Sequence, residues 1–149
     1  MTNEELMDLA LIEAEKAEAS GEVPVGAVLE LDGKIISKRH NERESSGDPT
    51  SHAEILVLRD ASSSEKTWRL NAATLVVTLE PCPMCAGAIW ASRVKKVIWG
   101  APNLEAGCLG SLYNFGVDPR LNHQIEIING VKSDQCSKLL TAFFGSNRQ

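Results

Sequence analysis

The first twenty residues carry apolar side chains at the spacing of an α-helix. Thr2 followed by Glu5 has the form of a capping box, and Ser20-Gly21 is typical of a helix end. One helical face collects the apolar residues Leu6, Leu9, Ala10, Leu11, Ala14 and Ala17. The pattern therefore predicts a first helix that ends near residue 20.

Two strand-like segments follow this helix, with a turn dipeptide between them. The segments VGAVLEL (25–31) and KIISKRH (34–40) are rich in apolar and β-branched residues. Asp32-Gly33 separates them and suits the left-handed dihedral angles of a tight hairpin turn. We predict two antiparallel strands.

The rest of the chain alternates between helix and strand patterns. The predicted elements are a helix from about His52 to Ala61, a buried strand at 74–79, a turn at Pro81 and Pro83 that leads into a helix through about Ser92, strands at 95–100 and 124–129, and a helix at 133–144 capped by Ser133 or Asp134. The polar loop 41–51 should supply capping groups for the first of these helices from Asp48-Pro49-Thr50-Ser51. The long connection 101–123 is a candidate substrate loop.

This order of elements predicts an α/β fold in one domain over residues 1–149, with a five-stranded mixed sheet and helices on both faces. The length and the 43% apolar content suit a single core. The net charge of −5 argues against a protein that coats nucleic acid by charge alone. No apolar run is long enough to span a membrane, and the acidic N-terminus differs from a secretory signal, so we expect a cytoplasmic protein.

Cysteine spacing points to a metal. In a reducing compartment the four cysteines are expected to be free thiols or metal ligands rather than disulfides. Cys82 and Cys85 are three residues apart at a predicted helix start, where both thiolates can approach one ion, and they make half of a tetrahedral zinc site. A redox pair is the alternative, but it fits poorly because thioredoxin-like proteins place that motif after their first strand. Cys108 and Cys136 are expected to be free thiols.

His52 and Glu54 begin the other predicted helix. Each alone is unremarkable, but both pairs follow loops at helix starts in neighbouring strand–helix units, which an open sheet can bring together. Three ligands with one open position is the catalytic form of zinc. Glu54 then suits a proton carrier better than a fourth ligand. This arrangement requires His52 to lie at the non-helical entry to its helix, because residues i and i+2 do not share a helix face.

The quoted residues match a known signature. His52-Ala53-Glu54 and Pro81-Cys82-Pro83-Met84-Cys85 have the H-x-E and P-C-x-x-C form of zinc-dependent base deaminases. More specifically, the chain resembles bacterial tRNA-specific adenosine deaminases over nearly its whole length, in the segments EVPVGAV, HNE, DPTSHAEI, TLEPCPMCAGAI, GSL, LNH and the closing FF. The resemblance implies a three-layer cytidine-deaminase-like fold, one Zn²⁺ per subunit and a homodimer. It also implies conversion of the wobble adenosine in a tRNA anticodon loop, here of an arginine tRNA, to inosine.

The resemblance also implies roles for individual residues. It assigns zinc ligation to His52, Cys82 and Cys85, and the proton shuttle to Glu54. It assigns substrate binding to Asn41, which would contact the purine, and to Val23, the backbone of Ala53, and Asn103. From its type and position alone, Asn41 is equally suited to a turn after a strand.

Two departures from the family pattern concern the substrate. The family usually has an acidic residue where Asn103 stands and often a lysine where Glu105 stands. An arginine is also expected directly after Phe143-Phe144, whereas this chain has Arg148 further on. These departures weaken the case for RNA contacts but leave the zinc assignment intact.

In so acidic a chain, RNA contacts would need a local cluster. The candidates for phosphate contacts are Arg93, Lys95, Lys96, Lys132, Lys138 and Arg148, and those for base stacking are Tyr113, Phe115, Phe143 and Phe144.

Two other functions are possible alternatives to tRNA deamination. One is deamination of a free base such as guanine or cytosine, which the AGCLGSL loop and the tail disfavour. The other is a catalytically silent zinc-binding module, which the presence of Glu54 disfavours.

Overall fold

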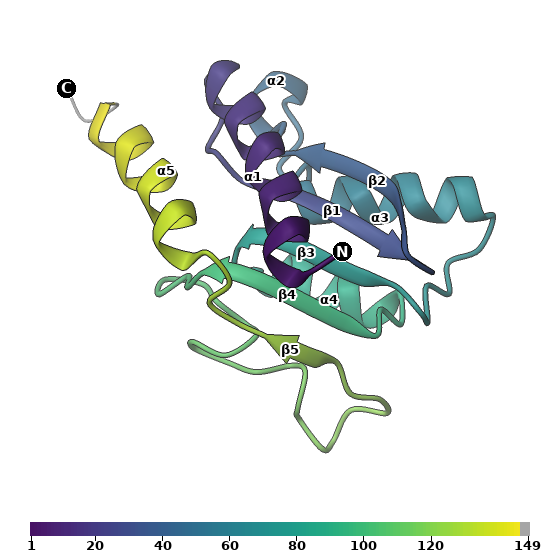
Figure 1. Ribbon diagram of the computed structural model, residues 1–149. Coiled ribbons are helices and arrows are strands. Elements are labelled where there is room, and N and C mark those ends of the chain that lie inside the picture. Colours follow the sequence, from purple (N-terminus) through teal and green to yellow (C-terminus); the bar gives the residue numbers. More distant parts are fainter. Residues whose placement is uncertain (147–149) are drawn as a thin grey trace.

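The computed structural model describes residues 1–146, and within them five strands form one mixed sheet in the order β2-β1-β3-β4-β5 (Figure 1). The strands are β1 (Gly26–Leu31), β2 (Lys34–His40), β3 (Thr74–Leu79), β4 (Lys96–Ala101) and β5 (Glu126–Ile128). β1 is antiparallel to both of its neighbours, whereas β3, β4 and β5 run parallel. The predicted five-stranded mixed sheet is confirmed.

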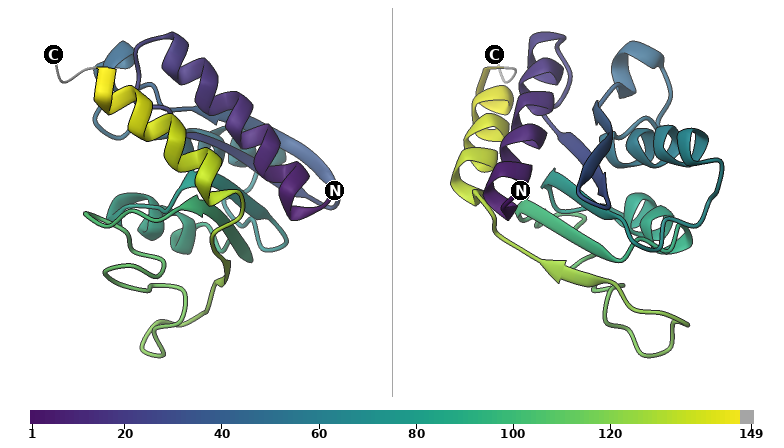
Figure 2. Two further views of the ribbon diagram at one scale, coloured as in Figure 1. Left: turned by 60° about the vertical axis from the view of Figure 1, so that its left-hand side comes forward. Right: turned by 45° about the vertical axis from the view of Figure 1, so that its right-hand side comes forward.

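Helices cover both faces of this sheet. On one face lie α1 (Asn3–Ala19) and α5 (Ser133–Ser146), and on the other lie α3 (Ala53–Glu65) and α4 (Pro83–Ala91) (Figure 2). Successive side chains of a strand point to opposite faces, so Leu75 and Val77 join the core under α3 and α4, while Val76 joins the core under α1. The α/β/α layering predicted from the sequence is therefore confirmed.

Local interactions fix the first helix, but more distant ones shape the segment before α3. The capping box of α1 is present: the Glu5 amide donates to Thr2 Oγ1 over 3.1 Å, and the Thr2 amide donates to Glu5 Oε1 over 2.9 Å. Within the predicted loop 41–51, residues Arg43–Ser46 form a short helix, α2. The buried Glu22 carboxylate accepts bonds from two amides of α2, a contact that the local sequence does not reveal.

The prediction that Asp48-Pro49-Thr50-Ser51 caps the next helix is wrong. The N-cap of α3 is His52, which makes no side-chain capping bond within residues 1–146. Asp48 instead accepts a 2.8 Å bond from the amide of Thr50, forming a local turn. The helix also continues to Glu65, one turn beyond the predicted end at Ala61.

The strand directions place two helix starts at the same end of the sheet. β2 and β3 are both antiparallel to β1, so they run in the same direction and their C-terminal ends lie at the same end of the sheet. The chain passes from β2 through α2 to α3, and from β3 directly to α4. The first residues of α3 and α4 therefore meet at that end of the sheet (Figure 1). Among residues 1–146, none of the helices combines the length and apolar character needed to cross a bilayer.

Candidate metal centre and catalytic pocket

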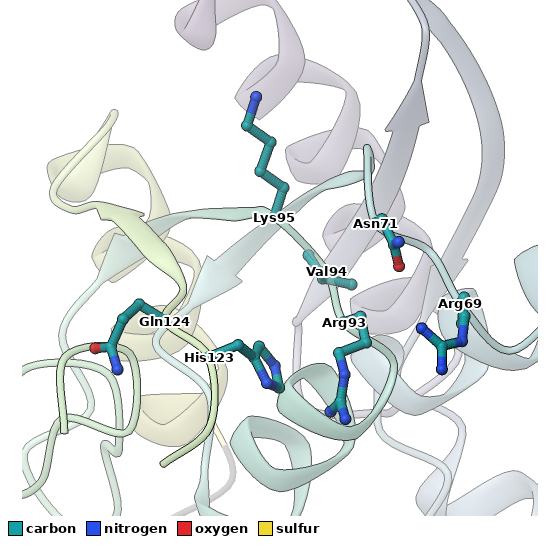
Figure 3. Close-up of a pocket in the computed structure, with 7 residues that line it drawn as sticks. All are labelled: Arg69, Asn71, Arg93, Val94, Lys95, His123 and Gln124. Atoms are coloured by element: carbon teal, nitrogen blue, oxygen red, sulfur yellow. The ribbon is translucent and has the colours of Figure 1, made fainter. Parts of the chain in front are cut away.

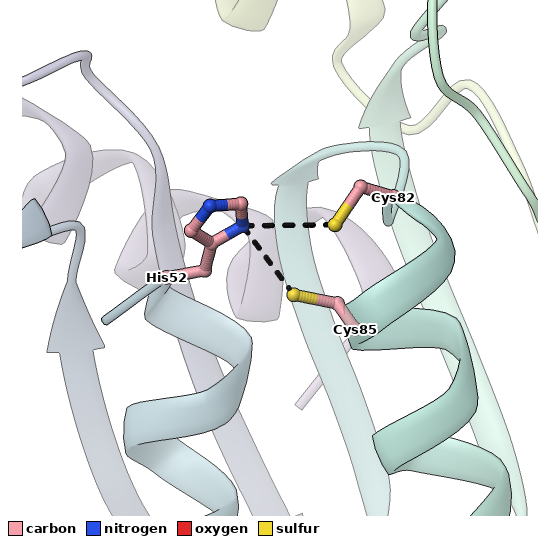
Figure 4. Close-up of side chains that lie close together, drawn as sticks. All are labelled: His52, Cys82 and Cys85. Carbon is pink, nitrogen blue, oxygen red and sulfur yellow. Dashed lines mark hydrogen bonds between the residues drawn. The ribbon is translucent and has the colours of Figure 1, made fainter. Parts of the chain in front are cut away.

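Three side chains from the two helix starts converge on one point. His52 Nδ1 lies 3.7 Å from Cys82 Sγ and 3.6 Å from Cys85 Sγ (Figure 4). The three ligand atoms all lie within 4.8 Å of one another. The structure thus brings together the three zinc ligands predicted from the sequence.

The backbone at the helix starts explains how these side chains are presented. His52 and Cys82 are the N-caps of α3 and α4, with extended dihedral angles of φ −76°, ψ 151° and φ −76°, ψ 175°. Pro83 follows Cys82 at the first helical position, where a missing N–H costs nothing. His52 therefore lies at the non-helical entry to its helix, as the joint site required.

The donor set suits zinc. Two sulfurs and one imidazole nitrogen are ligands that Zn²⁺ accepts in tetrahedral sites. The neighbouring Cys85 and His52 side chains lower the pKa of Cys82 to about 4, which favours the thiolate form that a metal binds. In the part of the chain that the structure describes, no fourth histidine, cysteine or carboxylate joins the group. Residues 1–146 therefore offer three of the four ligands that a tetrahedral zinc ion takes.

Glu54 lies beside this group without belonging to it. Its side chain is 4% exposed, and burial raises its pKa to about 7. A carboxyl group whose pKa lies near neutrality can both accept and release a proton, which is the property of a general acid–base residue.

A cavity of about 660 Å³ opens next to these side chains. His52, Glu54 and Cys82 form part of its lining. The four residues predicted to bind substrate also line it, namely Val23, Asn41, Ala53 and Asn103. The structure thus gathers the predicted substrate residues around the predicted catalytic group, and their roles in binding stay predictions.

The side chains of the two asparagines in the pocket wall are both hydrogen-bonded to backbone groups of the wall. Asn41 Nδ2 donates to the carbonyl of Val23 over 3.3 Å, and its Oδ1 accepts from the amide of Arg43 over 3.1 Å. Asn103 Oδ1 accepts from the amides of Glu105 and Ala106 over 3.3 and 3.0 Å. An acidic residue at position 103 would accept the same two bonds, so the departure from the family pattern preserves this turn.

Sequence reasoning missed several residues of the pocket wall. Arg43, from α2, is a cation in the lining that was not among the predicted phosphate contacts. Its place after Asn41 in HNER was an available signal. Glu80 and Leu104 were missed as well, whereas Phe144, a predicted stacking residue, does line the pocket and is 46% exposed.

Several of the predicted phosphate contacts do not line this cavity. Arg93 and Lys95 line a second hollow of about 260 Å³ with Arg69, near the starts of β3 and β4 and thus at the opposite end of the sheet (Figure 3). Figure 3 shows Lys95 extending away from the two arginines. Lys132 is paired with Asp8 over 2.5 Å, and Arg148 lies outside the described residues.

Comparison with known proteins agrees with this geometry. Residues 1–101 match the cytidine and deoxycytidylate deaminase zinc-binding region. A Bacillus subtilis (strain 168) protein named tRNA-specific adenosine deaminase is 51% identical over 150 residues, which cover 100% of this chain and 93% of that protein.

Solved structures of two deaminase types are similar to the chain. One structure comes from studies of A-to-I editing by tRNA:A34 deaminases at the wobble position of transfer RNA. It has a TM-score of 0.87 at 39% identity, and the match covers 91% of this chain and 99% of that structure's chain. A guanine deaminase from Bacillus subtilis has a TM-score of 0.68 at 29% identity, and the match covers 100% of this chain and 98% of the guanine deaminase chain. The similarity to the tRNA:A34 deaminase structure is the higher of the two in both TM-score and identity.

Proposed function

The chain belongs to the zinc-dependent cytidine and deoxycytidylate deaminase family, and within it to the tRNA-specific adenosine deaminases, and we propose that it converts the wobble adenosine of a tRNA to inosine. The observation that carries this proposal is the buried Glu54 carboxyl beside the His52, Cys82 and Cys85 group in the wall of a cavity. Such an arrangement suits addition of water to a base and loss of ammonia.

One zinc ion per chain would be held by His52, Cys82 and Cys85. When bound, it supplies Lewis acidity and lowers the pKa of a coordinated water to about 7. The three residues would supply two thiolates and a neutral imidazole, and the positions of His52 and Cys82 at the two helix starts hold these donor atoms close together beside the cavity.

Glu54 moves the protons of the reaction. As the water oxygen adds to C6 of adenine, Glu54 accepts a proton from that water and delivers it to N1. Glu54 then accepts the proton of the new hydroxyl group and delivers it to the amino nitrogen. The C6–N bond breaks, ammonia leaves, and the carbonyl at C6 is that of inosine.

The pocket residues would hold an unstacked purine. A base must leave its stack to reach such a cavity, which is easier in an anticodon loop than in a duplex. Four residues of the cavity wall are assigned to base binding, namely Val23, Asn41, Ala53 and Asn103. At the same pocket, Arg43 offers a cation for a backbone phosphate and Phe144 an aromatic face for a neighbouring base.

We also infer a homodimer that acts on an arginine tRNA in the cytoplasm. The helix α4, with the sequence PMCAGAIWA, carries no charged side chain. Gly87, Ala88 and Trp90 are only half-buried, and the buried indole Nε1 of Trp90 finds no acceptor within residues 1–146. An apolar helix of this kind supports packing against a second copy.

Incubation with candidate substrates tests the proposed activity. We expect an arginine tRNA with an anticodon adenosine to release ammonia and to gain inosine at that position. Guanine, cytosine and free adenosine should show less than about one hundredth of that rate, because they lack the flanking nucleotides that hold the base in the pocket. Inosine in the tRNA is detected by sequencing or nucleoside mass spectrometry. Turnover of guanine or cytosine with no inosine in the tRNA would favour a free-base deaminase, and absence of all turnover would favour a silent zinc module.

A further inference from the structure

A second carboxylate, Glu80, is buried between the end of β3 and the zinc ligand Cys82. It is 1% exposed, and in the region that the structure describes no lysine, arginine or histidine forms an ion pair with it. The mechanism above does not use it. A buried charge without a counterion is costly unless hydrogen-bond donors surround it.

The donors come from one segment, residues 102–111, which we name the rim loop. The amides of Asn103, Leu109 and Ser111 donate to the Glu80 carboxylate over 3.1, 3.2 and 2.9 Å. The Ser111 hydroxyl donates to the same group. Four bonds from three residues thus converge on one carboxylate, which has acceptor sites and no donor.

Close packing reinforces this attachment. A Cβ atom at Gly107 would lie 2.4 Å from Glu80 Cδ, so only glycine permits the loop to approach the carboxylate this closely. The amide of Cys108 donates to the carbonyl of Pro81 over 2.9 Å, and the amide of Glu80 donates to Ala101 over 2.9 Å. The rim loop is therefore bonded to the residues that lead directly into Cys82.

The rim loop forms one wall of the catalytic cavity, through residues 102–106, and Glu80 itself lines the cavity. The Asn103 amide is anchored on Glu80, and the Asn103 side chain in turn holds the next two amides of the loop. The position of this wall relative to the metal ligands thus depends on the Glu80 carboxylate, together with the single bond from Cys108 to Pro81.

We propose that Glu80 is a positioning residue, whose carboxylate fixes the rim loop against the metal-binding segment and so sets the affinity for RNA. This inference rests on the proposed function for its substrate. It does not make Glu80 a catalytic residue, because its oxygens are occupied by loop donors. Loss of the carboxylate should loosen the wall that contacts RNA and leave the His52, Cys82, Cys85 and Glu54 group in place.

The variant Glu80→Gln tests this role, since it keeps the shape of the side chain but turns one acceptor into a donor. Its amide group would face N–H donors, and at least one of them would be left unpaired. We expect KM for an anticodon stem-loop to rise at least about tenfold, with kcat within about threefold and zinc content unchanged. Amide hydrogen exchange of Asn103, Leu109 and Ser111 should quicken by at least about tenfold, with β1 and β3 still protected.

Two further variants are compared with Glu80→Gln, one that removes a single donor and one that serves as a control. Ser111→Ala alters an exposed residue and removes one donor, and should raise KM about threefold. Glu13→Gln alters a buried carboxylate of α1 that does not line the cavity, and should leave KM and rim-loop exchange unchanged.

Unchanged KM and exchange in Glu80→Gln would overturn the proposal, as would a fall in kcat at constant KM. Should Glu80→Gln fail to fold, wild-type KM and exchange in Ser111→Ala would overturn it. The exchange measurement needs no substrate, so it distinguishes failure of this inference from failure of the proposed function.

Discussion

Replacing Glu54 by glutamine is expected to lower turnover by at least about 10³-fold while leaving about one zinc ion per chain. The amide keeps the size of the side chain but cannot carry protons between water, N1 and the leaving amine. The carboxyl is buried, so solvent has little access to replace it in this role. Ammonia release and elemental analysis of the same preparation measure the two quantities.

Glu65→Gln is a matched control on the same helix. Glu65 is the last residue of α3 and is exposed, so this variant should retain wild-type turnover. Loss of zinc from Glu54→Gln would mean that Glu54 is a ligand, and full activity would exclude it as the proton carrier.

Replacing Cys82 by alanine should abolish both zinc binding and turnover. It removes one of three protein ligands, and the remaining imidazole and thiol would have to hold the ion alone, so we expect zinc below about 0.1 per chain after dialysis. The melting temperature should fall as well, because metal binding is linked to folding. Zinc content is measured by plasma mass spectrometry, and unfolding by calorimetry.

Cys136→Ala provides the comparison for this variant. Cys136 is also a free thiol, 1% exposed, but it lies in α5 and packs in the core beneath α1. Its replacement should cost some stability through a small cavity and leave zinc and turnover intact. Stoichiometric zinc in Cys82→Ala would contradict the ligand assignment.

The layers of the fold and the metal group were predictable because their signals are local. Apolar periodicity marked the strands and helices, and the Asp32-Gly33 turn joined β1 and β2 as expected. The His52, Glu54, Cys82 and Cys85 positions follow from spacing at two helix starts. Parallel directions of β2 and β3 then bring those starts together.

The framework of the pocket was not predictable, because it depends on contacts between distant segments. Glu22 and Glu80 are ordinary acidic residues in the sequence, yet each is buried and accepts amide bonds from a segment more than twenty positions away, α2 for Glu22 and the rim loop for Glu80. The helix α2, whose amides bond to Glu22, was missed for the same reason, whereas the capping of α3 was misjudged because Asp48 accepts a bond from the nearby Thr50 amide instead. Local side-chain types did not reveal which backbone donors those carboxylates would satisfy.

The most direct test of the account is X-ray absorption at the zinc edge of the purified wild-type protein, combined with metal quantification. We predict about one zinc per chain, with two sulfur neighbours at about 2.3 Å, one imidazole nitrogen at about 2.0 Å and a fourth position filled from solvent. Absence of zinc, or a coordination shell completed by a fourth side chain of the protein, would contradict it.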